Sequence, residues 1–65
     1  MQSDIEIKAD RLAGDPRISD YDFWRILRNV NNEIFSLSSR KEPIPIDLIR
    51  WRMIVMRARA KAMAR

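Results

Sequence analysis

The sequence predicts an all-α protein in which a short N-terminal helix is followed by an antiparallel helical hairpin, assembled as a dimer. Apolar residues recur at steps of three and four along most of the chain, which is the period of an α-helix. One glycine and three prolines leave few places for turns between these segments. Of the 65 residues, 46% are hydrophobic and 34% are charged, a composition typical of a globular protein. Residues 1–65 are therefore expected to form one small helical domain.

The size and composition of the chain exclude several classes of site. A domain of about 60 residues buries only about 60% of the surface of its unfolded chain, so it commonly needs a disulfide, a metal or a partner. The chain has no cysteine and no histidine, which excludes disulfides, thiolate or imidazole zinc sites and histidine-dependent catalysis. We therefore expect a protein that is not an enzyme, that has no cofactor, metal or small-molecule substrate, and that is stabilised by oligomerisation.

Helix-capping residues predict the first helix over residues 4–13. Ser3 and Glu6 fit a capping box, in which a serine side chain and a glutamate three residues later satisfy two backbone N–H groups. Gly14 suits the left-handed position that follows many helices, and Pro16 prevents the helix from resuming.

The second helix is expected over residues 20–37 and the third over residues 46–64. Ser19 is placed to cap the second helix, whereas Pro43 and Pro45 forbid its continuation. A proline is tolerated in the first turn of the third helix. The seam of the second helix repeats at steps of four and three through Phe23, Leu27, Val30, Ile34 and Leu37.

The third helix is apolar on two opposite sides. One face holds Ile46, Ile49, Met53, Met56, Ala60 and Met63, and the other holds Leu48, Trp51, Val55, Ala58 and Ala62. A surface helix of a monomer needs only one apolar stripe, and the chain offers only one other long helix to cover it. The second apolar side therefore predicts a homodimer, with an interface formed by Met53, Val55, Met56 and Ala60.

Aromatic residues lie off the main seams of both long helices. Exposed aromatics with an interleaved arginine are typical of the residues that anchor protein interfaces. The residues in question are Tyr21, Trp24, Arg28, Phe35 and Trp51. We interpret them as a candidate surface for a larger protein partner. The alternative is that the two tryptophans belong to the core, since aromatics dominate the cores of small proteins.

Charge is distributed unevenly along the chain. Residues 1–24 carry six acids and three bases, a net charge of −3, whereas residues 50–65 carry six bases and no acid. The two ends can attract each other within one chain or between chains. One stripe of the basic segment is a candidate contact for the phosphates of nucleic acid and consists of Arg50, Arg57 and Lys61. The alternative is that these cations only keep an apolar helix soluble.

Two weaker alternatives concern DNA and membrane surfaces. An alternating strand over residues 5–8 would suit a ribbon-helix-helix dimer, but the acids Asp4 and Glu6 would then face phosphates. A basic amphipathic helix with a tryptophan could lie on a membrane surface, although two apolar faces fit packing better. The sequence has no apolar run of about 18 residues and no signal-peptide pattern. We expect a cytoplasmic protein that does not bind membranes.

These features favour a regulator that binds other proteins. Small helical proteins with surplus aromatics act as inhibitors or accessory factors by masking a surface of a larger partner, such as a transcription regulator. The size and the two-faced helix suit the compact regulators that phages encode, a step made by analogy. The alternative is a dimeric DNA-binding regulator that uses its arginine-rich third helix.

Overall fold

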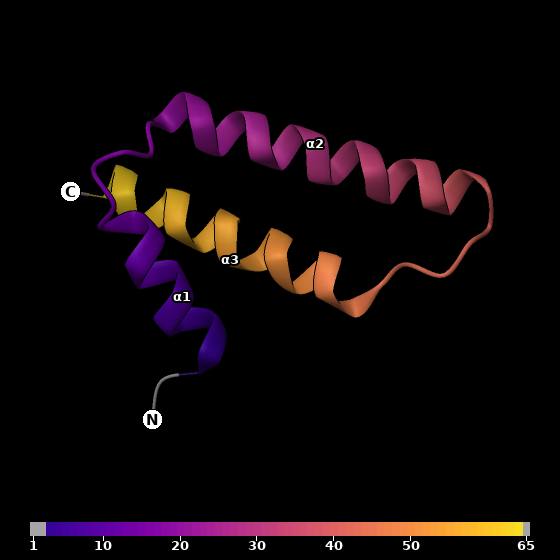
Figure 1. Ribbon diagram of the computed structural model, residues 1–65, viewed down its shortest axis with the longest axis horizontal. Coiled ribbons are helices and arrows are strands. Elements are labelled where there is room, and N and C mark those ends of the chain that lie inside the picture. Colours follow the sequence, from indigo (N-terminus) through magenta and orange to yellow (C-terminus); the bar gives the residue numbers. More distant parts are fainter. Residues whose placement is uncertain (1–2, 65) are drawn as a thin grey trace.

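The computed structural model describes residues 3–64 and contains three α-helices. They are α1 (Asp4–Ala13), α2 (Asp20–Ser39) and α3 (Ile46–Met63), shown in Figure 1. The prediction of an all-α protein is confirmed, and every helix boundary lies within two residues of its predicted position. Arg65, one base of the predicted basic segment, lies outside the described residues.

The first turn of α1 forms only half of the predicted capping box. The Ser3 hydroxyl oxygen accepts a hydrogen bond from the backbone N–H of Glu6 at 3.2 Å. The Glu6 carboxylate does not return this bond; it pairs instead with Arg57 and Lys61 of α3. Glu6, predicted to cap the start of its own helix, therefore holds α1 and α3 together.

The C-terminus of α1 corrects the prediction for Gly14. This residue has φ −87° and ψ −3°, so it continues the right-handed backbone and does not adopt the left-handed conformation. Its N–H donates to the carbonyl oxygen of Asp10 at 3.1 Å, as in a further helical turn. The helix ends because Pro16 disfavours helical backbone at Asp15. The Asp15 carboxylate then accepts a hydrogen bond from the backbone N–H of Arg17 at 2.9 Å, which forms the turn.

Both ends of α2 are closed by local hydrogen bonds. Ser19 caps the helix as predicted, and Asp22 completes a reciprocal capping box: the Ser19 N–H donates to the Asp22 carboxylate at 3.0 Å. At the other end the helix runs two residues beyond residue 37, because the N–H of Glu42 donates to the Leu37 carbonyl oxygen at 2.9 Å. This termination requires the left-handed conformation at Lys41, whose φ is 58°.

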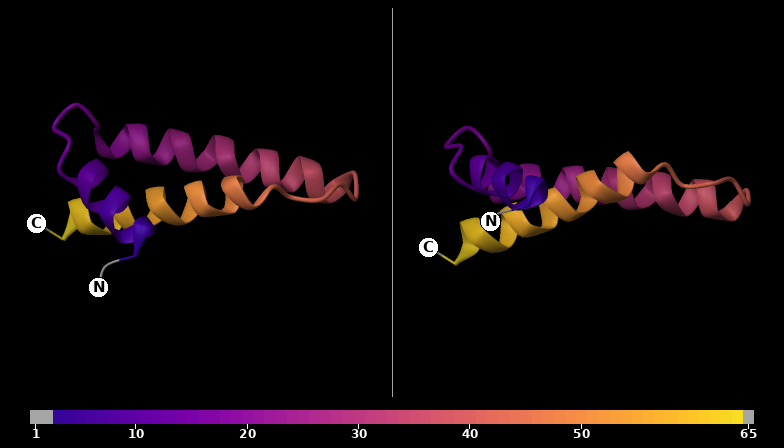
Figure 2. Two further views of the ribbon diagram at one scale, coloured as in Figure 1. Left: turned by 60° about the horizontal axis from the view of Figure 1, so that its bottom comes forward. Right: turned by 90° about the horizontal axis from the view of Figure 1, so that it is seen from below.

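Helix α3 packs against both other helices. It runs beside α2 in the opposite direction, whereas α1 lies obliquely across its C-terminal half (Figures 1 and 2). The three helices meet at a small core of Ala9, Ala13, Phe23, Val55 and Ala58. Three of these five residues are alanines, so the core is as modest as the chain length predicts. The structure contains no helix among residues 3–64 that is long and apolar enough to cross a membrane.

Candidate protein-binding surfaces

One apolar face of α3 is partly buried in the core and the other is open. The face that contains Val55 and Ala58 turns toward α1 and α2, and both side chains are fully buried. The opposite face, here called the methionine row, consists of Ile46, Ile49, Met53, Met56, Ala60 and Met63, all of them exposed. Ile46 is 70% exposed and Met63 is 65% exposed. Contiguous exposed apolar surface of this kind is typical of interaction sites.

A shallow groove of about 380 Å³ lies between the methionine row and α2. It is lined by Leu27 of α2 and by Met56, Arg59, Ala60 and Met63 of α3. Methionine side chains adapt easily to the shape of a partner because they are unbranched and polarisable. The groove therefore extends the apolar surface from α3 onto the neighbouring helix.

The predicted dimer residues divide between these two faces. Met53, Met56 and Ala60 lie in the methionine row, where a second chain can reach them. Val55 is 0% exposed and lies in the intramolecular core, so its assignment to an interface needs correction. The physical reason is that α1 and α2 both lie on the Val55 side of α3, and one face of α3 is then enough for two neighbours.

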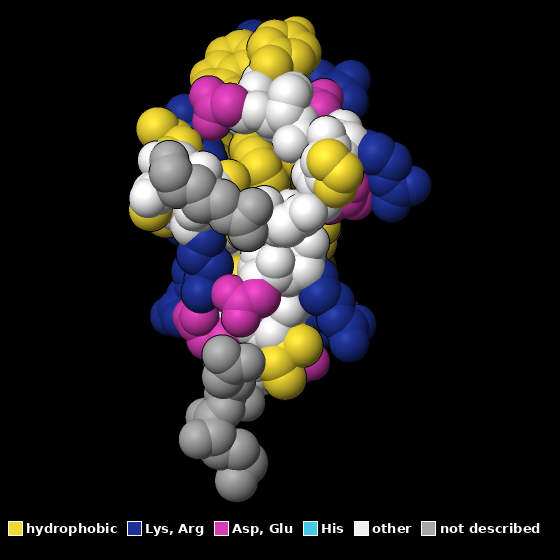
Figure 3. All heavy atoms as spheres, turned by 90° about the vertical axis from the view of Figure 1, so that its left-hand side faces the viewer, with side chains coloured by type: hydrophobic (Ala, Val, Ile, Leu, Met, Phe, Trp, Pro, Cys, Tyr) yellow, Lys and Arg dark blue, Asp and Glu magenta, His cyan; other side chains and the backbone are white. Residues whose placement is uncertain are grey.

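The outward side of α2 carries a cluster that we call the aromatic edge, consisting of Tyr21, Trp24, Arg28 and Phe35. All four are exposed; Trp24 is 43% exposed and Phe35 is 73% exposed. The rings of Tyr21 and Trp24 have centroids 5.8 Å apart, and the Arg28 guanidinium carbon lies 5.4 Å from the centroid of Trp24. Figure 3 shows hydrophobic side chains gathered at the top, over the start of α2. Trp24 is thus excluded from the buried core.

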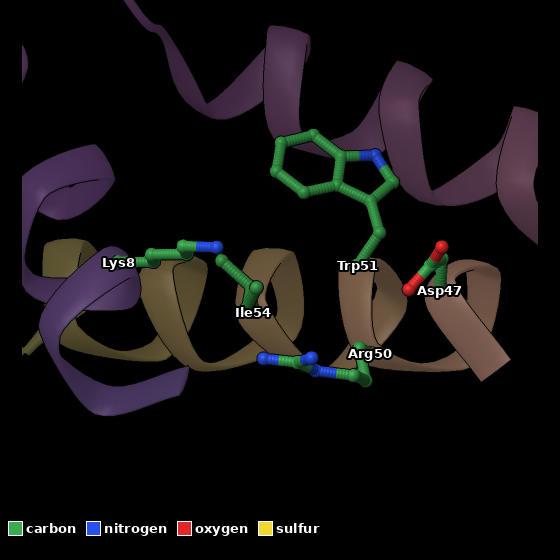
Figure 4. A pocket seen from close by; sticks show the side chains of 5 residues that line it. All are labelled: Lys8, Asp47, Arg50, Trp51 and Ile54. Atoms are coloured by element: carbon green, nitrogen blue, oxygen red, sulfur yellow. The ribbon is translucent and has the colours of Figure 1, made fainter. Parts of the chain in front are cut away.

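Trp51 lies apart from the aromatic edge. Its indole rises from α3 and forms one wall of a pocket of about 290 Å³ (Figure 4). The other lining residues are Lys8 of α1 and Asp47, Arg50 and Ile54 of α3. The five predicted partner-binding residues therefore form one group of four on α2 and one isolated tryptophan on α3.

The predicted nucleic-acid stripe is brought together, but against carboxylates of α1. Arg50 contacts Asp4 at 2.6 Å, and Lys61 contacts Asp10 at 2.7 Å. The Glu6 carboxylate lies between Arg57 and Lys61 and pairs with both. Figure 3 shows the resulting mixture of basic and acidic side chains on this end of the molecule. We call these contacts the α1–α3 ion pairs.

The other edge of α3 makes equivalent contacts with α2. The Arg59 guanidinium contacts the Asp20 carboxylate at 3.2 Å, and that of Arg52 donates to the Asn31 side-chain oxygen at 2.7 Å. The individual pairs could not be predicted from the sequence, although the opposite charges of the two chain ends indicated that these ends attract each other.

Neither a metal-binding cluster in the described residues nor a similar protein helps to define the function. Residues 3–64 contain no cluster of three acidic side chains that could hold a metal ion. Comparisons with protein-family models, with curated proteins and with solved structures found no match to this chain.

Proposed function

We propose that this protein is a small non-catalytic regulator that binds other proteins and works as a homodimer. The observation that carries the proposal is the methionine row, which stays exposed along the whole length of α3, while the opposite face is buried at Val55 and Ala58. In this proposal the row joins two copies and the aromatic edge contacts a larger partner. The protein would act as inhibitors and accessory factors do, by masking a surface of a protein such as a transcription regulator.

The small core supports the dimer. Among the described residues only seven hydrophobic side chains are buried, and Val55 is the single large one with no exposed surface. A core of this size gives limited stability, and a protein without disulfides can gain stability by binding a second chain. A twofold interface places the same row of both copies face to face, so its apolar residues contact one another.

Sedimentation equilibrium tests the dimer. We expect the wild-type chain to be dimeric at tens of micromolar, about the range in which a modest interface associates. Met56→Asp should produce a folded monomer, because this side chain is exposed in the isolated chain and an aspartate there is buried only in the dimer. Asn29→Asp, which adds the same charge at an exposed position of α2, is the matched control. A monomeric wild-type chain would remove the proposal.

The alternative is a dimeric DNA-binding regulator that uses Arg50, Arg57 and Lys61. Their alignment on one side of α3 favours it, but their contacts with α1 carboxylates weaken it, since a phosphate would have to displace those partners. Duplex DNA binding distinguishes the two classes. If submicromolar binding at physiological salt is lost when all three residues are changed to Gln, the order of the two proposals is reversed, because phosphate contacts dominate such affinity.

A further inference from the structure

Two exposed arginines of α2 lie among its exposed aromatic residues without an ion pair to any residue between 3 and 64. In α3, Arg50, Arg57 and Lys61 pair with α1, and Arg59 pairs with Asp20. By contrast, the two arginines on the outward side of α2 form no ion pair with any residue between 3 and 64; they are Arg25 and Arg28. Arg11, Lys41 and Arg52 also form no ion pair within this range, but Arg25 and Arg28 are the two that lie among the exposed aromatics of α2.

These arginines are interleaved with the exposed aromatics. Side chains at steps of four, three and four line up along one side of a helix. One such row is Tyr21, Arg25, Arg28 and Asn32, and the neighbouring row is Trp24, Arg28, Asn31 and Phe35. All of these side chains are exposed, and neither row contains an acid.

The acids of α2 are engaged or placed elsewhere. Asp20 contacts Arg59, and Asp22 accepts hydrogen bonds from Ser19 in the capping box. Glu33 follows Asp22 by eleven residues, which places it on the same side of the helix, away from the aromatic edge. The charge of Arg25 contributes to lowering the pKa of Asp22, so this carboxylate partly balances Arg25. No carboxylate of α2 forms an ion pair with Arg25 or with Arg28 of the edge.

The centre of the edge is already ordered before a partner arrives. The Arg28 guanidinium lies over the Trp24 indole, and the Tyr21 ring packs beside the same indole. A cation held over an aromatic face keeps its N–H groups available to an acceptor. Because these side chains are already placed, a partner loses less conformational entropy when it docks.

We propose that the aromatic edge binds an acidic amphipathic segment of the partner protein. Carboxylates of this segment pair with Arg25 and Arg28, and an apolar side chain packs against Trp24 and Phe35. The inference rests on the proposed protein-binding function and adds the chemistry of the partner. Charge complementarity carries it, since exposed apolar rings beside two arginines that form no ion pair match apolar side chains flanked by acids.

A single-stranded nucleic acid fits this edge less well. Such ligands require free aromatic faces on which bases stack, within a basic groove that follows the phosphates. Here the Arg28 guanidinium lies over the Trp24 indole, and on this convex side of the helix the exposed rows contain only two cations, Arg25 and Arg28. The experiment must therefore distinguish binding of a nucleic acid from binding of an acidic peptide.

Fluorescence anisotropy with defined probes tests the inference on the full chain. The probe is a labelled peptide of about 20 residues, long enough to follow α2, with leucines on one face and glutamates beside them. A peptide with lysines in place of the glutamates and a single-stranded dT oligonucleotide of similar length are the comparison probes. We expect the wild-type protein to bind the glutamate peptide at least about tenfold more tightly than either comparison probe.

Matched variants locate the binding. Arg25→Gln combined with Arg28→Gln should weaken binding of the glutamate peptide about tenfold, and Trp24→Ala should do the same. Arg50→Gln combined with Arg57→Gln removes the same charge from the α1 side and should change binding less than about twofold. Circular dichroism of all variants should match the wild type, since the substituted side chains lie at the surface.

The outcomes distinguish this inference from the proposed function. Equal binding of the glutamate and lysine peptides, or no effect of the Arg25 and Arg28 changes, overturns the acidic partner but leaves a protein-binding surface. No binding of the glutamate peptide to the wild type also overturns it. Tighter binding of the dT oligonucleotide, lost in Trp24→Ala, would overturn both proposals in favour of nucleic acid.

Discussion

The two helices that flank α3 are held to it by different kinds of contact. Helix α1 contributes the small side chains Ala9 and Ala13 and three carboxylates in the α1–α3 ion pairs. Helix α2 contributes larger apolar side chains, with Phe23 in the shared core and Val30 buried further along. Exposed ion pairs contribute at most about 1 kcal/mol each, whereas a buried phenylalanine contributes several. The comparison indicates that α1 is the more easily detached of the two helices.

The ends of α1 and α2 also differ, in how far each is closed by hydrogen bonds of its own. Helix α2 begins with a complete capping box and ends with hydrogen bonds from the N–H groups of residues 40–42 to carbonyl oxygens of its last turn. In α1 the capping box is half formed, because Glu6 pairs with α3 instead. The local order of α1 thus depends more on α3 than that of α2 does.

Removing Phe23 should have the largest effect. Its side chain is 3% exposed and lies where α2 meets both other helices, so Phe23→Ala should cost about 3–5 kcal/mol of unfolding free energy. In a chain of this size that loss should unfold the protein, as seen by circular dichroism. Phe35→Ala is the matched control on the same helix; it should change stability by less than about 0.5 kcal/mol because Phe35 is exposed. Equal losses would show that the division between core and edge is wrong.

Overfilling the α1 contact should be the next most damaging change. Ala9 has no exposed surface, so Ala9→Leu should cost about 1–3 kcal/mol and push α1 away from α3. Hydrogen exchange is the measurement, since it reports opening helix by helix. The amides of α1 should lose protection before those of α2 and α3. Simultaneous loss in all three helices would break the comparison, because α1 would then belong to one cooperative unit.

The helix boundaries could be predicted from the sequence because short-range chemistry sets them. Serine caps and prolines act over three or four residues, and Ser19 and Pro45 lie at the observed limits. Where a boundary was wrong, the cause was local but unusual: α2 extends to Ser39 because Lys41 adopts a left-handed backbone normally reserved for glycine.

The sequence could not decide which apolar face of α3 is covered. Periodicity identifies both faces, but the choice depends on where the connection over residues 14–19 places α1, and that is a tertiary property. This is why Val55 was assigned to an interface and is found in the core. The candidate edge on α2 was easier to predict, since Trp24 and Phe35 lie off the seam that packs. The absence of ion pairs at Arg25 and Arg28 required the structure.

A change at Glu6 should reveal the electrostatic part of the α1 contact. Glu6→Gln removes the shared acceptor of Arg57 and Lys61 and should cost about 0.5–1 kcal/mol at low salt. Because salt screens exposed charges, this cost should shrink toward zero as the salt concentration approaches 1 M. Thermal melts at several salt concentrations measure it. Glu33→Gln, at an exposed position of α2, should show no such dependence; a salt-independent effect of Glu6→Gln would mean that packing dominates this contact.

Acid should weaken the start of α2 through Asp22. Hydrogen bonds from the Ser19 backbone and hydroxyl lower the pKa of Asp22 below its ordinary value of 3.8. A carboxyl group with a lowered folded-state pKa stabilises the fold above that ordinary value, and the contribution is lost as the pH falls through the lowered pKa. Asp22→Asn should therefore reduce the loss of stability as the pH falls below about 4. Unchanged acid sensitivity in denaturant titrations would show that other carboxylates dominate.

The residues that follow α1 and α2 should give the smallest effects and the most closely matched comparison. Lys41 has φ 58°, where a side chain is unfavourable, so Lys41→Gly should stabilise the protein by up to about 1 kcal/mol. Gly14 has φ −87° and needs no special freedom, so Gly14→Ala should stabilise it by about 0.4–1 kcal/mol through the unfolded state. The exchanged substitutions should act differently: Lys41→Ala should give no gain, and Gly14 should tolerate most side chains. Urea unfolding of the three variants measures these shifts, and a loss of stability in Gly14→Ala would show that close packing, and not backbone conformation, requires glycine after α1.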